Sequence, residues 1–376
     1  MMKKILEVSV ANFKREIDCS LKIVKSQTVP KELANFKEWL YQFYQDLRTK
    51  IDKFEYYLNL NDSSIEADIY LSLATDRNRF QLISSKLMPG LYRTHKNDRL
   101  PLLLLKWLHD QHEHTKDKPF VIMDGDFAIL PQVGFPICYY LPIVSQQSLL
   151  FLPLFFHELG HYLYQCHAQE MDDLVIELQK RLTKHLAIPF KTNSLQSKDS
   201  INKAQVIVET WYEWIQEFFC DAVGLTIGGS SYLKAFSHYL RISGRQSFFH
   251  AENDLMNSGH PVTWLRIQFL ISRAHEMGLT DEADNVEFEW RAIAQALDIT
   301  EDYFGYYTTA YKDDVKEILD YMLIETSPMT YTNYLHDKEG NPNFLNLIKE
   351  AWAKFEDAPD KYVEWEQKSL NELLAK

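Results

Sequence analysis

Amphipathic helical patterns dominate this sequence, and glycine is too scarce for a fold made mainly of tight turns. The stretch 29–58 carries apolar residues at three- and four-residue spacing, and Pro30 stands where a first-turn proline fits a helix. The 376 residues include only 12 glycines, which argues against an all-β fold. Further helical patterns cover 64–87, 100–112, 148–169, 172–186, 202–225, 231–243, 261–277, 281–297, 313–324 and 344–376. We therefore expect a mainly α-helical protein.

The segment 118–144 has a different character. It contains two β-prone runs on either side of Asp124-Gly125, a strong turn signal, and a third run at 137–141 that follows proline and glycine residues. This pattern predicts a small antiparallel sheet, so the expected fold class is mainly α with a small antiparallel β-sheet.

The charge balance and the cysteines limit the partners and the compartment. The net charge of −13 disfavours nucleic acid and anionic membranes, which both require dense positive charge. The longest apolar run, 149–156, is far shorter than the roughly 20 residues that span a bilayer. Polar residues interrupt the N-terminal apolar stretch, unlike a signal peptide. The four cysteines form no Cys-x-x-Cys pair, so we expect a cytoplasmic protein with reduced thiols and no membrane span.

One short motif has the spacing of a metal-binding helix. In His157-Glu158-Leu159-Gly160-His161 the two histidines are four residues apart, about 40° around a helix axis, so both rings face one side. A single zinc ion requires that reach. Glu158 lies where it can act on a metal-bound water. A chain of this composition gives about 0.03 chance matches to the pattern, so a zinc site is the expectation.

A third ligand is expected on the helix at 202–225. Glu217 and Asp221 are four residues apart and share a face among apolar neighbours, where a carboxylate needs a cation or a donor. Zinc would satisfy Glu217. Asp221 could accept a hydrogen bond from His157, since a zinc-bound histidine normally donates its other ring N–H. The alternative is a solvated stripe of carboxylates.

A third segment contains His260-Pro261 and, further on, Arg266. Pro261 suits the first turn of a helix, which places His260 at the N-terminal edge of that helix. Taken alone, a histidine before a helix is most often a surface cap.

These three segments together resemble the gluzincin metallopeptidases, and most closely the group that holds the CAAX prenyl proteases and the bacterial heat-shock protease HtpX. The motifs of that group are HExxH, ExxxD and HPxxxxRI, and the chain matches them in order and internal spacing over about residues 120–275. The resemblance implies zinc ligands His157, His161 and Glu217, the base Glu158, the supporting Asp221, and His260 and Arg266 near the substrate. It also implies a zincin-like catalytic core at 118–278, between a helical N-terminal region (1–117) and a helical C-terminal region (279–376).

The function expected from these residues is zinc-dependent hydrolysis of a peptide or protein substrate, with Glu158 as general base and His260 as a second contact for the developing negative charge. Arg266 would hold a substrate carbonyl or a nearby carboxylate, and the strand at 137–141 could pair with the substrate backbone. Membrane location and prenylated substrates are not carried over, because the chain has no spanning segment. Two alternatives stay open. One is a non-catalytic zinc-fold protein whose flanking helices bind a protein partner, and the other is a zinc hydrolase of non-peptide amides.

Other metal-like or polar residues have a structural interpretation. His109, His112 and His114 stand among charged residues and are expected on the surface. Cys220 points about 60° away from the face of Glu217 and Asp221, which favours core packing. The tyrosines at 306, 307 and 311 are expected in an aromatic core, with a substrate-polarising hydroxyl as the alternative.

Overall fold

The chain divides into two compact units, Met1–His109 with Asp117–Gln146 and Asp110–Lys116 with Gln147–Lys376. Within the described residues, no helix combines the length and the apolar character needed to cross a membrane. The computed structural model describes residues 2–60, 62–93, 98–112, 114–130, 134–142, 145, 148–188, 203–241, 248, 251–256, 258–328 and 344–374.

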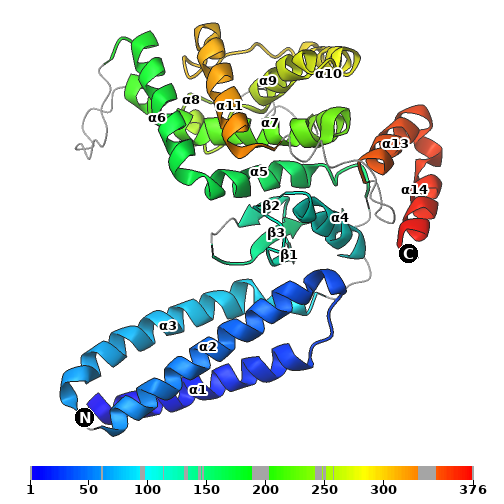
Figure 1. Ribbon diagram of the computed structural model, residues 1–376. Helices are drawn as coiled ribbons and strands as arrows, with labels where there is room; N and C mark the ends of the chain where they lie inside the picture. Colours follow the sequence, from blue (N-terminus) through cyan, green and yellow to red (C-terminus); the bar gives the residue numbers. More distant parts are fainter. Residues whose placement is uncertain are drawn as a thin grey trace. The chain divides into compact units, whose positions relative to one another are not determined.

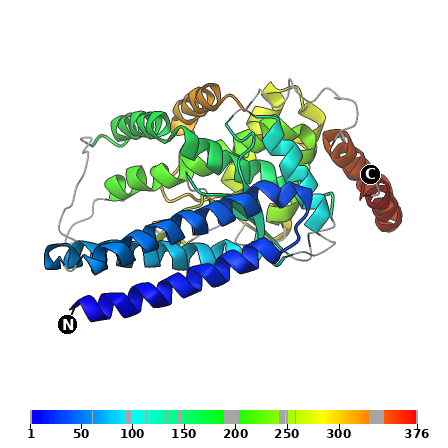
Figure 2. The same ribbon diagram turned by 60° about the horizontal axis from the view of Figure 1, so that its bottom comes forward.

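The first unit contains a bundle of three long helices, which lie side by side in both views (Figures 1 and 2). Each helix buries one stripe of apolar residues at helical spacing, as α1 does with Leu6, Val10, Phe13 and Ile17. The expected helical character of the N-terminal region is therefore confirmed, and its arrangement as a bundle is a finding of the structure. The helices of the unit are α1 (Met2–Ser26), α2 (Ala34–Asn59), α3 (Glu66–Lys86) and α4 (Arg99–Asp110).

A small mixed sheet belongs to the same unit, so the expected antiparallel sheet is corrected. Its strands are β1 (Phe120–Asp124), β2 (Ala128–Leu130) and β3 (Ile137–Leu141), in the order β1-β3-β2. β1 pairs with β3 in parallel, and β2 pairs with β3 antiparallel. The turn at Asp124-Gly125 thus makes no hairpin. β1 and β3 are nearly continuous apolar runs with both faces buried, which is the pattern of parallel strands.

The central place of β3 also overturns the expectation that a substrate strand pairs with it. Both edges of β3 are already hydrogen-bonded, to β1 and to β2. An added strand needs an edge with free backbone groups.

The two units divide the chain differently from the three regions expected from sequence. The sheet segment 117–146 groups with the N-terminal helices, and residues 279–376 share a unit with His157 and His161.

The second unit is helical, and most of its elements follow the sequence pattern (Figure 1). The patterns at 202–225 and 231–243 form one element, α7, with a break at Gly229, and α8 was not expected. The pattern at 344–376 forms two helices because Pro359 starts a new one. The pattern at 148–169 becomes helical only at Leu154, after a turn. The helices are α5 (Leu154–Cys166), α6 (Ala168–His185), α7 (Lys203–Arg241), α8 (Glu252–Leu255), α9 (Thr263–Glu276), α10 (Thr280–Ala296), α11 (Lys312–Thr326), α13 (Phe344–Asp357) and α14 (Pro359–Leu374).

Helices α5 and α7 touch at Gly160, where no side chain separates them. A Cβ atom built on Gly160 would lie 2.8 Å from the Cα atom of Cys220 and 3.1 Å from its Cβ and Sγ atoms. Only glycine allows the two backbones to come this close. Because Gly160 lies between His157 and His161 on α5, this contact sets the distance from both histidines to α7.

We expect Gly160→Ala to lower the free energy of unfolding by about 1–3 kcal/mol, the usual cost of overpacking a core. The higher helix propensity of alanine offsets at most about 1 kcal/mol of that loss. Urea unfolding followed by circular dichroism measures the change.

The matched control is Gly259→Ala, since a Cβ atom there meets nothing within 4 Å. A second substitution, Cys220→Ala, should not restore stability to Gly160→Ala, because the nearest atom is the Cα atom of residue 220. Wild-type stability in Gly160→Ala would show that the two helices can separate without cost.

Candidate metal centre

Helix α5 holds His157 and Glu158 in the interior, whereas His161 is partly exposed. Most of its residues are buried, including the apolar Phe155, Phe156 and Leu159, so the helix is surrounded by core on nearly all sides. His157 and Glu158 are each 7% exposed. Polar groups at that depth require partners, and α7 supplies them for His157.

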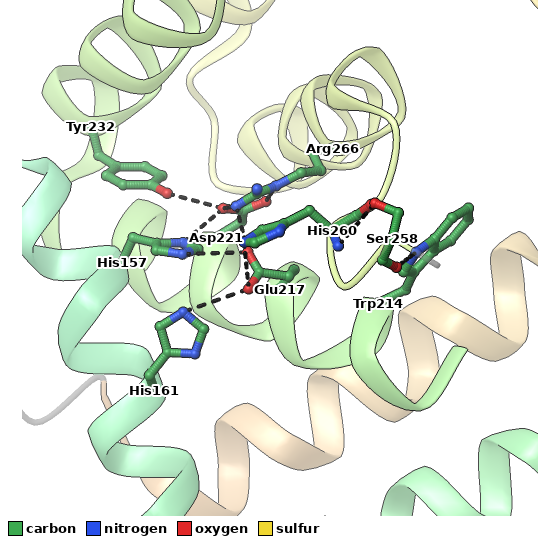
Figure 3. Close-up of polar contacts among 9 residues, drawn as sticks. All are labelled: His157, His161, Trp214, Glu217, Asp221, Tyr232, Ser258, His260 and Arg266. Atoms are coloured by element: carbon green, nitrogen blue, oxygen red, sulfur yellow. Dashed lines mark hydrogen bonds and ion pairs between the residues drawn. The ribbon is translucent and has the colours of Figure 1, made fainter. Parts of the chain in front are cut away.

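The ring nitrogens of α5 converge on Glu217 of α7, as Figure 3 shows. Nε2 of His157 lies 3.5 Å from Oε2 of Glu217, and Nε2 of His161 lies 3.6 Å from Oε1. Two ligand atoms bound to one tetrahedral zinc ion at 2.0–2.1 Å lie about 3.3–3.4 Å apart. Each histidine nitrogen thus lies at about ligand separation from a different oxygen of Glu217. His157, His161 and Glu217 come together in the structure, and their role as a ligand set stays a prediction.

Glu217 is a buried carboxylate beside a buried guanidinium. Its Oε2 atom is buried and forms no hydrogen bond with the described residues, although Nη2 of Arg266 lies 3.1 Å away as an ion pair. Burial would raise the pKa of Glu217, but the charge of Arg266 and the neighbouring histidines lower it overall. A lowered pKa favours the carboxylate form, which is the form that binds metals.

Cys220 is a second candidate for the third ligand. Potential ligand atoms of His157, His161 and Cys220 lie within 4.8 Å of one another. Burial raises the pKa of the Cys220 thiol well above its usual value, whereas a metal binds the thiolate. Cys220 also occupies the contact between α5 and α7. That place in the helix contact favours core packing for Cys220, so Glu217 is the preferred candidate for the third ligand.

Asp221 lies one helical turn after Glu217 and is the centre of the polar network (Figure 3). Its Oδ1 atom accepts from Nδ1 of His157 at 2.9 Å and from the hydroxyl of Tyr232 at 3.2 Å. The hydrogen bond from His157 to Asp221 is the one expected from the sequence. It fixes the His157 tautomer so that Nε2 faces Glu217.

Arg266 of α9 is buried and binds carboxylates of the chain itself. Its Nε and Nη2 atoms donate to the two oxygens of Asp221 at 2.8 and 2.7 Å. This is the forked pairing that a guanidinium makes best. Two roles were expected for Arg266, to hold a substrate carbonyl or a nearby carboxylate. In the structure its guanidinium binds the carboxylate of Asp221.

His260 lies at the bend before α9, and its side chain is 70% exposed. Its Nε2 atom is 3.4 Å from Oε1 of Glu217, so it reaches the same carboxylate as the α5 histidines. The bend is attached to α7, since Nε1 of Trp214 donates to the carbonyl of Ser258 at 3.2 Å. The structure thus brings His260 to the site, and its part in the chemistry stays a prediction.

Burial sets the protonation of the remaining groups. It raises the pKa of Glu158 to about 7, close to neutral pH. Burial and the charge of His157 lower the pKa of His161 to about 4, which leaves a neutral imidazole able to bind a metal. Burial is the largest single influence on the pKa of His157 and acts to lower it. The hydrogen bond to Asp221 and the charges of Asp221, Glu158 and Glu217 together outweigh burial and raise the pKa.

Sequence reasoning missed two aromatic residues of α7, Tyr232 and Phe236, which contact Asp221 and His157. Both follow a break in the helix at Gly229, which has φ 53° and ψ −136°. The glycine pair at 228–229 marks that break in the sequence, but its spacing does not reveal which residues the break turns towards Asp221.

The expected surface position of the histidines at 109–114 is wrong for two of them. His109 is buried, its Nε2 atom is hydrogen-bonded to the hydroxyl of Tyr139 at 3.0 Å, and its ring stacks on Phe120. His112 is buried too, and its Nδ1 atom accepts from the backbone N–H of His114. The charged residues beside them in the sequence indicated a surface position. Their burial instead depends on partners that are distant in the sequence. The core interpretation is confirmed for Tyr306 and Tyr311, which are buried, whereas Tyr307 is only partly buried.

Comparison with known proteins gives no match. No protein-family model matches the chain, and neither the curated proteins nor the solved structures contain a match.

We expect Arg266→Met to lower the free energy of unfolding by about 3–5 kcal/mol, because it leaves two buried carboxylates without their guanidinium. Asp221→Asn should also destabilise, since it leaves the guanidinium poorly paired. The double variant should lose less than the sum of the single losses, because the two groups face each other. Urea unfolding of the four proteins measures the coupling, and strictly additive losses would contradict this account of the pair.

Proposed function

We propose that this chain is a zinc-dependent peptidase whose metal is held by His157, His161 and Glu217. One observation carries the proposal: both histidine Nε2 atoms lie 3.5–3.6 Å from the carboxylate oxygens of Glu217, close to the separation of ligands on one zinc ion. The buried Glu217 Oε2 atom without a hydrogen bond is further support.

Zinc, when bound, polarises a carbonyl group and lowers the pKa of a coordinated water towards about 7. The chain's own residues do the rest. Glu158 lies beside His157 on α5 and is nearly buried, so it is placed to take a proton from the water and return it to the leaving amine. His260 is the exposed side chain nearest to Glu217 in this arrangement, and we assign it the contact with the substrate carbonyl.

The peptide as substrate rests on the resemblance of three motifs to the gluzincin metallopeptidases. An intact Glu158 also favours catalysis, because a protein that needs only the metal fold has no use for a base. A cytoplasmic location is part of the proposal and rests on the cysteines, all four of which are free thiols.

We expect Glu158→Gln to keep its zinc and to lose roughly 10²- to 10⁴-fold in hydrolysis, the usual contribution of a general base. Digestion of a peptide library followed by mass spectrometry gives the activity, and metal analysis gives zinc per chain. Wild-type protein with zinc but no cleavage would favour the non-catalytic alternative, and cleavage of small amides alone would favour the amide hydrolase. Full activity in Glu158→Gln would remove Glu158 from the mechanism.

A matched pair of substitutions tests the third ligand. Glu217→Ala should reduce the zinc content sharply, whereas Cys220→Ala, on the same helix, should keep about one zinc per chain. The reason is that the Glu217 oxygens lie 3.5–3.6 Å from both histidines, whereas Cys220 fills the contact between α5 and α7. Metal analysis after dialysis against a weak chelator measures both. The reverse result would make Cys220 the third ligand.

A further inference from the structure

The part of α7 after Gly229 places two aromatic side chains on the polar network around Asp221. Gly229 has φ 53° and ψ −136°, a conformation outside the helical region that glycine adopts without strain. The helix resumes in a new direction and carries Tyr232 and Phe236, one turn apart and stacked with ring centroids 5.3 Å apart. The sequence motifs do not include either residue.

Tyr232 is fully buried and reaches back over the first half of its own helix. Its hydroxyl donates to Oδ1 of Asp221 at 3.2 Å, beside the hydrogen bond from His157 (Figure 3). Gly224 makes the space for the ring, since a Cβ atom there would lie 2.4 Å from Cε2 and Cζ of Tyr232. Gly228 does the same for its Cβ atom, at 2.7 Å. The close fit holds the phenol against Asp221.

Phe236 contacts two of the side chains that donate hydrogen bonds to Asp221, His157 and Arg266. Its ring stacks on the His157 imidazole with centroids 5.8 Å apart and planes 25° apart. The guanidinium carbon of Arg266 lies 4.8 Å from the centre of the same ring, within the range of a cation–π contact. A stacked ring restricts rotation of the imidazole about its side-chain bonds. The hydrogen bond to Asp221 restricts the same rotation from the ring edge.

We propose that Tyr232 and Phe236 are positioning residues for His157, and that together they hold its Nε2 atom towards Glu217. The inference rests on the proposed metal site. Neither side chain needs to touch metal or substrate. Tyr232 acts through the shared acceptor Asp221, and Phe236 acts through the imidazole face. Loss of either contact lets His157 rotate and weakens the metal site.

The test compares Tyr232→Phe and Phe236→Leu with Phe219→Leu. Phe219 lies on the same helix, is fully buried and has its ring contact with Tyr164 instead of His157, so it controls for the loss of one core ring. Tyr232→Phe keeps the ring over Gly224 and removes only the hydroxyl. Two quantities are measured on the full chain. One is zinc affinity by competition with a chelator, and the other is the visible absorption of the cobalt-loaded protein, which depends on ligand geometry.

We expect a 10- to 100-fold loss of zinc affinity and a changed cobalt spectrum in Tyr232→Phe and in Phe236→Leu, the size seen when an outer-shell partner is removed. Phe236→Tyr should restore the affinity and the spectrum, because it keeps the stacked ring. Phe219→Leu should lower stability and leave both metal readouts unchanged.

Wild-type affinity and spectrum in Tyr232→Phe and Phe236→Leu would overturn the inference, as would equal losses in Phe219→Leu. Failure of the proposed function has a different signature. In that case the wild-type chain binds no stoichiometric zinc, and His157→Ala changes neither readout.

Discussion

The close approach of α5 and α7 at Gly160 is the contact on which the site depends. The helix backbones meet there without a side chain between them, because a Cβ atom would lie 2.8 Å from the Cα atom of Cys220. At that spacing His157 and His161 reach Glu217, and Nδ1 of His157 reaches Asp221. A wider spacing would break these contacts between α5 and the buried carboxylates of α7. The close packing of the two helices thus sets the distances on which the proposed metal site relies.

Buried charge explains why α9 is part of the same structure. Glu217 and Asp221 bring two carboxylates into the core, and burial of either one alone would be costly. Arg266 offsets one of them through its forked bond to Asp221. Two carboxylates against one guanidinium leave a negative charge near Glu217 and the imidazoles. A divalent cation at that point would balance the interior, which connects the stability of the fold with the proposed zinc site.

The residues that follow helical spacing were predictable, and those that depend on distant contacts were not. Four-residue spacing placed His157 with His161 and Glu217 with Asp221 on common faces, and the burial of the carboxylates pointed to a cation. Strand order could not be derived from the sequence. The turn signal at Gly125 indicated a hairpin between β1 and β2, whereas β1 pairs with β3. Likewise, the interior position of His109 depends on its contacts with Tyr139 and Phe120, which no local pattern contains.

The break at Gly229 explains why helical periodicity did not identify Tyr232 and Phe236 as residues near the site. On an uninterrupted α7, Tyr232 would stand three turns beyond Asp221 and could not reach its carboxylate. The change of direction at Gly229 returns Tyr232 to Asp221, and the absent side chain of Gly224 leaves room for the ring. A single helix therefore provides the proposed third ligand, the acceptor of the His157 hydrogen bond, and the tyrosine that donates to that acceptor. Glycines at 224, 228 and 229 make this possible, and their value comes from the space and dihedral angles that they allow.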